Sequence, residues 1–300
     1  HLEIVISCIL VFGISWVGRT YSYEDFSAKQ NCFNTSDGRI HYLDEGSGEV
    51  IVLLHGVPTS GWLYRKMAPE LVNNGYRVIV PDMLGFGNSD HPLGDRVYSP
   101  ENHAKRLIEL MNHLKVEKWT QVVHEAGALW VAPILQKTPE RISKLVVMNA
   151  IIDPAAVNWK EQIGTGLMAK IGLKLQKMGI KNSSFVSNYV RKNMTVSSLT
   201  KKELAGYELP ILNGKTTAIF YHYSFMLDAI AQGSKGLSQT DLSKTLFIWG
   251  KADNVLNWQA QSNLLQKEKH DLHLLDCGHL VPEDAPKKAD SLILNFIRPK

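Results

Sequence analysis

The sequence has few cysteines and little net charge, and both shortages exclude classes of protein. Its three cysteines in 300 residues lie far apart and have no metal-ligand spacing, so we expect neither a disulfide framework nor a metal site. The net charge is only +4, and no basic run is interleaved with aromatic residues, which argues against nucleic acid as a partner. No internal repeat occurs. The length suits one large α/β domain, or one such domain with an inserted lid.

Charge is also missing from a long stretch near the N-terminus. The fifteen residues from Ile4 to Gly18 contain no charged side chain. As a helix they would reach roughly 22 Å, short of the ~30 Å hydrocarbon core of a bilayer. Three interpretations stay open: a helix bound to a membrane or a partner protein, a retained signal segment, or a helix packed on its own domain. We favour a membrane or partner anchor over residues 1–20, and hence a membrane-associated protein in the secretory pathway or an organelle.

Short apolar runs alternate with helical periodicity along most of the remaining chain. The runs are rich in β-branched residues, as expected of strands that are buried on both faces. Such alternation is typical of a mostly parallel, doubly wound α/β sheet. Strands are predicted at "GRIHYLD", "VIVLL", "RVIVPD", "WTQVV", "KLVVMN", "TLFIWG" and "LHLL". Helices are predicted over 62–74, 100–114, 127–137, 258–267 and 282–297.

The alternation stops in the middle of the chain. Residues 154–237 are rich in Lys, Leu, Met and Tyr, with helical spacing and no strong strand. We therefore predict a helical lid over 154–237 and a core domain formed by 30–153 and 238–300. An insertion after a sheet strand can cover the strand ends, where open α/β sheets bind ligands.

One strand-to-helix turn, "VVHEAGALW" from Val122 to Trp130, has the pattern of a nucleophile elbow. Glu125 stands at its apex, where hydrolases usually carry Ser, Asp or Cys. The small residues that follow it let the helix approach the strand closely. A surface glutamate on an ordinary loop would give the same letters, so this stretch alone does not decide between the two interpretations.

Two later stretches favour the catalytic interpretation. "GKADNV" puts Asp253 after one strand, and "DCGHLVPED" puts His279 after the next. The chain order is then apex residue, acid and histidine, all at one edge of the sheet. That is the order of nucleophile, acid and base in α/β-hydrolases.

From about Gly38 to Ile297 the chain resembles the α/β-hydrolase superfamily, and within it the haloalkane dehalogenases, with the epoxide hydrolases next. The residues that carry the resemblance are "HGVPTSGWLYRKMAPEL", "GYRVIVPDMLGFGNSDHP", "VVHEAGALW", "LVVMNA", "GKAD" and "DCGHLV". The resemblance implies an α/β-hydrolase fold, a small apolar substrate and no cofactor. It gives Glu125 the nucleophile position, His279 the role of base and Asp253 the role of supporting acid. The backbone N–H groups of Val57 and Ala126 fall at the oxyanion-hole positions.

The departures from the dehalogenase pattern gather in the site. The elbow aspartate is Glu125, which adds a methylene, and a misplacement of about 1 Å can lower a rate on the order of 100-fold. The tryptophan and the polar residue that usually hold the halide are Ala126 and Val57, so only backbone donors are expected to remain for a leaving halide. Epoxide opening would need a lid tyrosine as proton donor. The candidates are Tyr189, Tyr207, Tyr221 and Tyr223.

Two functions follow from this mixture. The first is a hydrolase of the dehalogenase or epoxide-hydrolase type with weak or altered activity. The second is a hydrolase fold kept as an inactive structural or binding subunit of a membrane-associated assembly. The substitutions at the elbow favour the second, and the intact pair of Asp253 and His279 favours the first.

Overall fold

The computed structural model describes most of the chain, with gaps in the insertion. The described ranges are 22–94, 96–154, 187–212, 218–219, 221–222, 225, 236–256 and 271–298. The apolar run over residues 4–18 and the helix predicted over 258–267 lie outside them, and both stay predictions. Among the described helices, none combines the length and apolarity needed to cross a bilayer.

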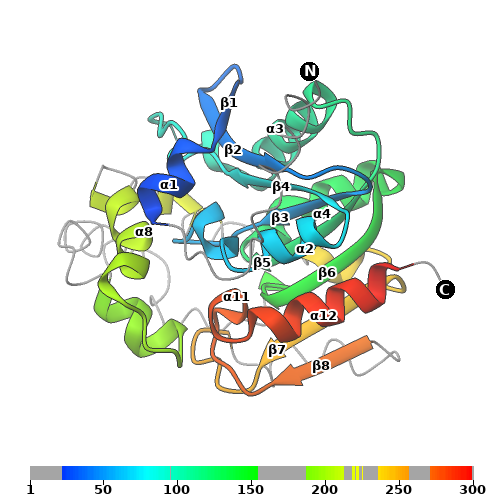
Figure 1. Cartoon of the computed structure of the whole chain (residues 1–300). Helices are drawn as coiled ribbons and strands as arrows, with labels where there is room; N and C mark the ends of the chain where they lie inside the picture. Colours follow the sequence, from blue (N-terminus) through cyan, green and yellow to red (C-terminus); the bar gives the residue numbers. More distant parts are fainter. Residues whose placement is uncertain are drawn as a thin grey trace, which may run out of the picture.

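Eight strands form one sheet in the order β1-β2-β4-β3-β5-β6-β7-β8 (Figure 1). Strands β1 and β2 pair antiparallel with their neighbours, and the other strands run parallel. The predicted parallel-rich sheet is therefore confirmed. The strands are β1 (Asn31–Asn34), β2 (Arg39–Glu45), β3 (Val50–Leu54), β4 (Arg77–Asp82), β5 (Trp119–Glu125), β6 (Ile142–Ala150), β7 (Thr245–Gly250) and β8 (Asp271–Leu275).

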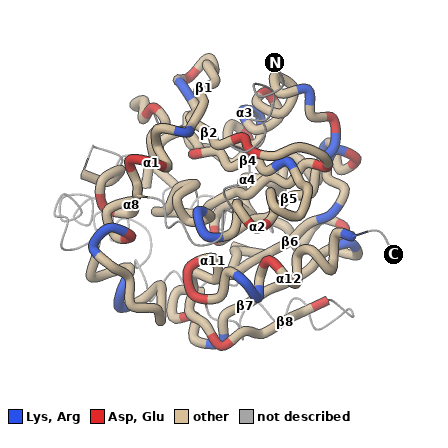
Figure 2. Tube along the Cα trace, in the orientation of Figure 1, with Lys and Arg blue, Asp and Glu red and all other residues tan. Residues whose placement is uncertain are grey.

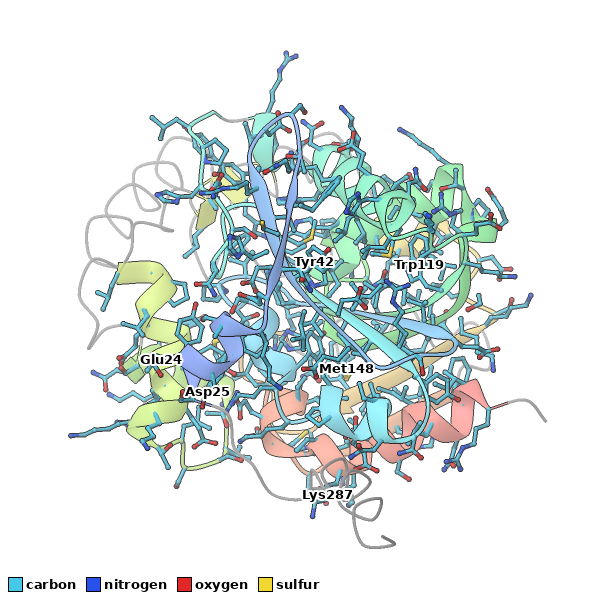
Figure 3. The ribbon with its side chains drawn as sticks, turned by 45° about the horizontal axis from the view of Figure 1, so that its top comes forward. Glu24, Asp25, Tyr42, Trp119, Met148 and Lys287 are labelled. Atoms are coloured by element: carbon cyan, nitrogen blue, oxygen red, sulfur yellow. The ribbon has the colours of Figure 1, made fainter. Side chains whose placement is uncertain are left out.

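The central strands form because continuous apolar runs can be buried on both faces only inside a helix-covered sheet. In β3 the four residues from Ile51 to Leu54 are fully buried, and every residue of β5 is buried. Figure 3 shows Met148 and Trp119 in the interior, whereas Glu24 and Lys287 lie at the periphery. Strand β1 was not predicted, because "NCFN" is short and largely exposed.

Helices cover both faces of this sheet (Figure 1). Helix α3 packs on α4, and α2 packs on α12. The described α-helices are α1 (Tyr23–Ala28), α2 (Ala68–Asn73), α3 (Pro100–His113), α4 (Gly127–Lys137), α8 (Lys201–Leu212), α11 (Val281–Asp284) and α12 (Pro286–Ile297). Figure 2 shows acidic and basic residues interspersed over the described chain, in keeping with the small net charge.

Two predicted helices are interrupted. The helix expected over 282–297 is divided at Ala285, whose φ of −138° is not helical. Pro286 follows it, and a proline disfavours the helical conformation of the residue before it. The helix expected over 62–74 is likewise divided, into a 3₁₀ turn at Gly61–Tyr64 and α2.

The described part of the insertion is helical. It contains a π-helical turn at Val190–Met194, helix α8 and a 3₁₀ turn at Gly236–Gln239. No described residue between 154 and 237 belongs to a strand. The boundaries of the lid and of the two core segments stay predictions.

Candidate active site

Glu125 ends β5 at a sharp turn into α4. Its φ is +49°, a left-handed conformation that is uncommon for a residue other than glycine and costs about 1–3 kcal/mol. The loop after β3 comes very close, since a Cβ built at Gly56 would lie 2.5 Å from the Glu125 Cβ. A Cβ at Gly127 would lie 2.8 Å from the carbonyl oxygen of His55. The predicted elbow geometry is therefore present, with glycines where the backbones meet.

The carboxylate of Glu125 accepts two backbone hydrogen bonds. Its Oε2 accepts from the N–H of Val57 at 2.8 Å and from the N–H of Ala126 at 2.5 Å. The sequence analysis expects these N–H groups at the oxyanion-hole positions, and in the structure both of them face Glu125. The added methylene lets the side chain fold back onto the N–H of the next residue, so Glu125 takes both donors itself. Both hydrogen bonds go to Oε2, and neither involves the second oxygen, Oε1.

Asp253 and His279 form a hydrogen-bonded pair at the same edge of the sheet. Asp253 lies after β7 and His279 after β8, and the His279 Nδ1 is 3.0 Å from the Asp253 Oδ2. The other Asp253 oxygen accepts the N–H groups of Val255 at 2.7 Å and Leu256 at 2.9 Å. Both side chains are almost completely buried. The structure thus brings together the acid and base that the chain order predicts.

Asn149 is a further member of the site that the sequence analysis missed. It lies near the end of β6 with φ of +40°, and its Nδ2 donates to the Asp253 Oδ2 at 2.5 Å. Its Oδ1 accepts the N–H of Gly250 at 2.9 Å, which ties β6 to β7. A polar residue that closes the apolar run "LVVM" at the catalytic edge is the signal that could have found it.

The ring of His279 has one nitrogen engaged and one available. Nδ1 faces Asp253, whereas the buried Nε2 has no hydrogen-bond partner among the described residues. Beneath it lies His124, whose Nε2 is 2.9 Å from the His279 carbonyl oxygen, with the two ring centroids 4.7 Å apart. Burial lowers the pKa of His124 to about 3, so this ring is neutral and donates to the carbonyl. An available Nε2 is what a base that accepts a proton from water requires.

Burial and charge act against each other in this site. Burial raises the pKa of the Glu125 carboxyl above its ordinary value, although the N–H of Val57 and the ring of His279 oppose the rise. For His279, burial would lower the pKa, but the Asp253 carboxylate beside it raises the value above the ordinary one. Burial would raise the pKa of Asp253, but His279 and the surrounding donors hold it below its ordinary value. The site therefore favours a protonatable base supported by an ionised acid.

The lid tyrosines occupy different surroundings. Burial raises the pKa of Tyr189, and the negative charges of Glu125 and Asp253 add to the rise, so this phenol lies within their electrostatic reach. Tyr207 instead donates its hydroxyl to Glu283 at 2.5 Å, which makes it a structural contact rather than a member of the site. Tyr221 stacks on Tyr98 with ring centroids 5.8 Å apart. Tyr223 lies outside the described residues.

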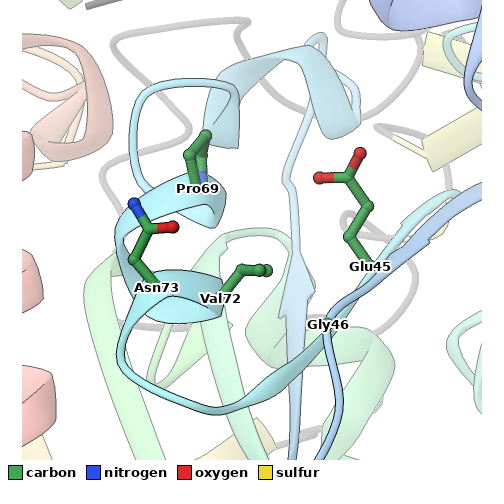
Figure 4. Close-up of a pocket in the computed structure, with 5 residues that line it drawn as sticks. All are labelled: Glu45, Gly46, Pro69, Val72 and Asn73. Carbon is green, nitrogen blue, oxygen red and sulfur yellow. The ribbon is translucent and has the colours of Figure 1, made fainter. Parts of the chain in front are cut away.

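Hollows elsewhere on the described surface do not resemble a catalytic site. Figure 4 shows the residues that line one of them, Glu45, Gly46, Pro69, Val72 and Asn73. Its volume is about 250 Å³. Because Glu45 pairs with Val78 at the start of β4, this hollow lies at the amino-terminal edge of the parallel strands, opposite the elbow. Within the described ranges, no three His, Cys, Asp or Glu side chains gather as a metal site would require.

A family model of the α/β hydrolase fold matches residues 49–286, so the chain belongs to the α/β hydrolase fold family. It is 25% identical to a haloalkane dehalogenase from Psychrobacter cryohalolentis over 276 residues, covering 87% of this chain and 88% of that enzyme. It is 39% identical to a haloalkane dehalogenase from Mycolicibacterium paratuberculosis over 135 residues, which span only 44% of either chain. A third relative, a cis-3-alkyl-4-alkyloxetan-2-one decarboxylase from Shewanella oneidensis, is 27% identical, covering 90% of this chain and 88% of that enzyme.

Two solved structures share the fold. One is a thermophilic esterase from Thermogutta terrifontis, with a TM-score of 0.71, 19% identity, and coverage of 90% of this chain and 98% of that one. The other is an α/β hydrolase from Nostoc, with a TM-score of 0.68, 22% identity and the same coverage. The α/β-hydrolase fold is therefore confirmed, as is the resemblance to haloalkane dehalogenases. The roles of Glu125, Asp253 and His279 stay predictions.

Proposed function

We propose that this chain is a hydrolase in which Glu125 attacks carbon and His279, supported by Asp253, activates the water that releases the product. The observation that carries the proposal is that the two oxygens of the Glu125 carboxylate have different hydrogen-bonding surroundings. Oε2 accepts the N–H groups of Val57 and Ala126, and neither of these hydrogen bonds involves Oε1. One oxygen is thereby fixed, and the other is available as a nucleophile.

The chemistry follows from this arrangement. Oε1 of Glu125 forms a bond to the substrate carbon as the carbon–leaving-group bond breaks, and the leaving group takes the electron pair. Water then gives a proton to the Nε2 of His279 and attacks the ester carbonyl carbon. Negative charge develops on Oε2, which already faces the two N–H donors, each worth about 3–4 kcal/mol in such a role. Collapse of this intermediate restores the carboxylate and releases an alcohol.

The substrate we propose is a small apolar molecule whose leaving group is an oxygen in a strained ring, rather than a halide. Ala126 and Val57 offer no side-chain donor to a halide. A ring oxygen needs a proton instead, and the phenol of Tyr189, which lies within electrostatic reach of Glu125 and Asp253, is the donor that we propose. The relative named as an oxetan-2-one decarboxylase acts on a strained oxygen ring, which supports the same substrate class.

The test compares leaving groups on one enzyme. A short bromoalkane and a terminal epoxide of the same chain length are assayed for halide release and diol formation. We expect the epoxide to react faster, and Tyr189→Phe to lower only the epoxide rate, because a halide leaves without a proton. Halide release that exceeds diol formation would contradict the oxygen-ring substrate.

A further variant tests the alternative that the chain is an inactive structural or binding subunit. In His279→Gln, water activation is lost, so an ester on Glu125 should accumulate and be visible by mass spectrometry. No ester from any of these electrophiles would sink the hydrolase proposal in favour of a structural or binding subunit.

A further inference from the structure

The carboxylate of Asp284 collects hydrogen bonds from two separate parts of the chain. Its Oδ2 accepts the N–H of Gly278 at 2.8 Å, from the loop that carries His279. The same oxygen accepts the N–H of Val196 at 3.1 Å, and Oδ1 accepts the N–H of Ser197 at 3.1 Å. Oδ1 also accepts the hydroxyl of Thr195. One carboxylate therefore joins the base loop to residues 195–197 of the inserted segment.

A second link lies next to the first. The N–H of Leu280 donates to the carbonyl oxygen of Met194 at 2.8 Å. His279 is thus bracketed by Gly278 and Leu280, and each of these neighbours is hydrogen-bonded to this junction. The fit is tight, because a Cβ at Gly278 would lie 3.0 Å from the Asp284 Oδ2 and 3.1 Å from the Met194 carbonyl oxygen.

The inserted segment held in this way is the one that brings Tyr189 to the site. The π-helical turn Val190–Met194 follows Tyr189 directly and ends where the Asp284 contacts begin. The charges of Glu125 and Asp253 raise the pKa of the Tyr189 phenol after burial, so this residue lies within their electrostatic reach. A displacement of residues 195–197 would therefore be transmitted to Tyr189 on one side and to His279 on the other.

The residue before Asp284 makes a parallel junction with α8. Glu283 accepts the hydroxyl of Tyr207 and is paired with the guanidinium of Arg65. Lys66 also lies 2.6 Å from the Glu283 Oε2. Figure 1 shows α8 and α11, the two elements that these contacts join. The adjacent carboxylates of α11 thus each fasten a different described part of the insertion to the core.

We propose that Asp284 is a positioning residue that fixes the His279 loop relative to residues 195–197, the part of the insertion that follows Tyr189 and the π-helical turn. Its effect on turnover rests on the proposed function. Its effect on the geometry does not, because it can be measured in protein without substrate.

The test is Asp284→Asn, with Asp276→Asn as the matched control. Both changes remove one carboxylate near His279, but Asp276 is exposed and bonds only to Lys251 among the described residues. Two readouts need no substrate: the imidazole signals of His279 followed by NMR across pH, and the rate of tryptic cleavage after Arg191 and Lys192. Both cleavage sites are exposed and precede the residues that Asp284 holds.

In Asp284→Asn, we expect His279 to titrate at a lower pH, because it is less firmly held against Asp253, and tryptic cleavage to accelerate on the order of 10-fold. Asp276→Asn should leave both unchanged. If the chain is an active hydrolase, the kcat of Asp284→Asn should fall roughly 10- to 100-fold, as a misplacement near 1 Å would cause. Asp284→Glu should restore part of each loss.

Thr195→Val serves as a second variant should Asp284→Asn fail to fold, since it removes a single donor and preserves the shape of the side chain. It should shift both substrate-free readouts in the same direction by a smaller amount. An unchanged His279 titration and cleavage rate in a folded variant would overturn the proposal. Lost turnover with both substrate-free readouts intact would overturn it too. A wild-type protein without activity would count against the proposed function alone.

Discussion

The elbow and the acid–base pair hold their reactive side chains by different means. At the elbow, both hydrogen bonds to the Glu125 carboxylate come from the backbone, at Val57 and Ala126. At the pair, His279 is held by the Asp253 side chain, which is itself held in part by the Asn149 side chain. Backbone donors survive a change of side chain, whereas a chain of side-chain contacts does not. This difference explains how the elbow can accept a glutamate, and it predicts that the pair tolerates substitution less well.

The largest effect is expected from Asp253→Asn. The amide can donate to the His279 Nδ1 and thereby fix the wrong tautomer, and in an acid–base pair of this kind the turnover falls on the order of 10⁴-fold. The measurement is kcat with the best substrate of the leaving-group comparison. Asp241→Asn, in the exposed loop before β7, is the control and should leave kcat unchanged. If kcat fell by less than about 10-fold, the acid–base pair would tolerate substitution as well as the elbow does, and the comparison would fail.

A smaller loss is expected at Asn149. Its hydrogen bond to the charged Asp253 is worth about 1.5–3 kcal/mol, so Asn149→Ala should lower kcat roughly 10- to 100-fold. Asn149→Gly is the informative partner, because glycine relieves the left-handed backbone and removes the same side chain. Equal kcat losses in both variants would assign the effect to the side chain. A harmless Asn149→Gly would show instead that backbone strain is what matters.

Substitutions at the elbow should have smaller effects on the rate than those at the acid–base pair, and some should raise the rate of halide release. Glu125→Asp keeps both backbone donors, so we expect halide release from a short bromoalkane to rise several-fold at most, up to ~10-fold. Adding Ala126→Trp and Val57→Asn restores side-chain donors for the halide and should raise the rate further, provided that the indole fits at this buried position. Halide release by ion chromatography is the assay. A triple variant slower than Glu125→Asp would show that the site has no room for a halide-binding side chain.

The smallest expected effect is a shift in the pH at which activity rises. His279 must be neutral to accept a proton, and its raised pKa places the rise of activity above the ordinary value near 6.5. The same shift contributes stability that is fully present below the unfolded pKa and is lost as pH rises through the folded value. Removing the Asp253 charge should move the residual activity profile to lower pH. A profile that stays in place would mean that another group controls it.

Much of this arrangement could be predicted from the sequence, because periodicity and chain order are local properties. The runs at 50–54, 77–82 and 245–250 became strands with the predicted bounds. The direction and contacts of a side chain, by contrast, depend on residues that are distant in the sequence. Neither the fold-back of Glu125 onto Ala126 nor the contact of Asn149 with Asp253 could be derived from spacing, since each depends on how neighbouring strand ends approach. The hydrogen bond from the Tyr207 hydroxyl to Glu283 is a further contact that spacing does not predict, because it joins residues far apart in the chain.

The central claim is that Glu125 itself attacks carbon, and oxygen-18 tests it most directly. Wild-type protein in excess over substrate is allowed one turnover in oxygen-18 water, quenched and digested with trypsin in ordinary water. The peptide Trp119–Lys137 contains one acidic side chain, Glu125, so a label within it can be assigned without ambiguity. We predict that the label enters Glu125 while the first product carries ordinary oxygen. A labelled product with an unlabelled Glu125 would contradict the account, because His279 would then have activated water directly on the substrate.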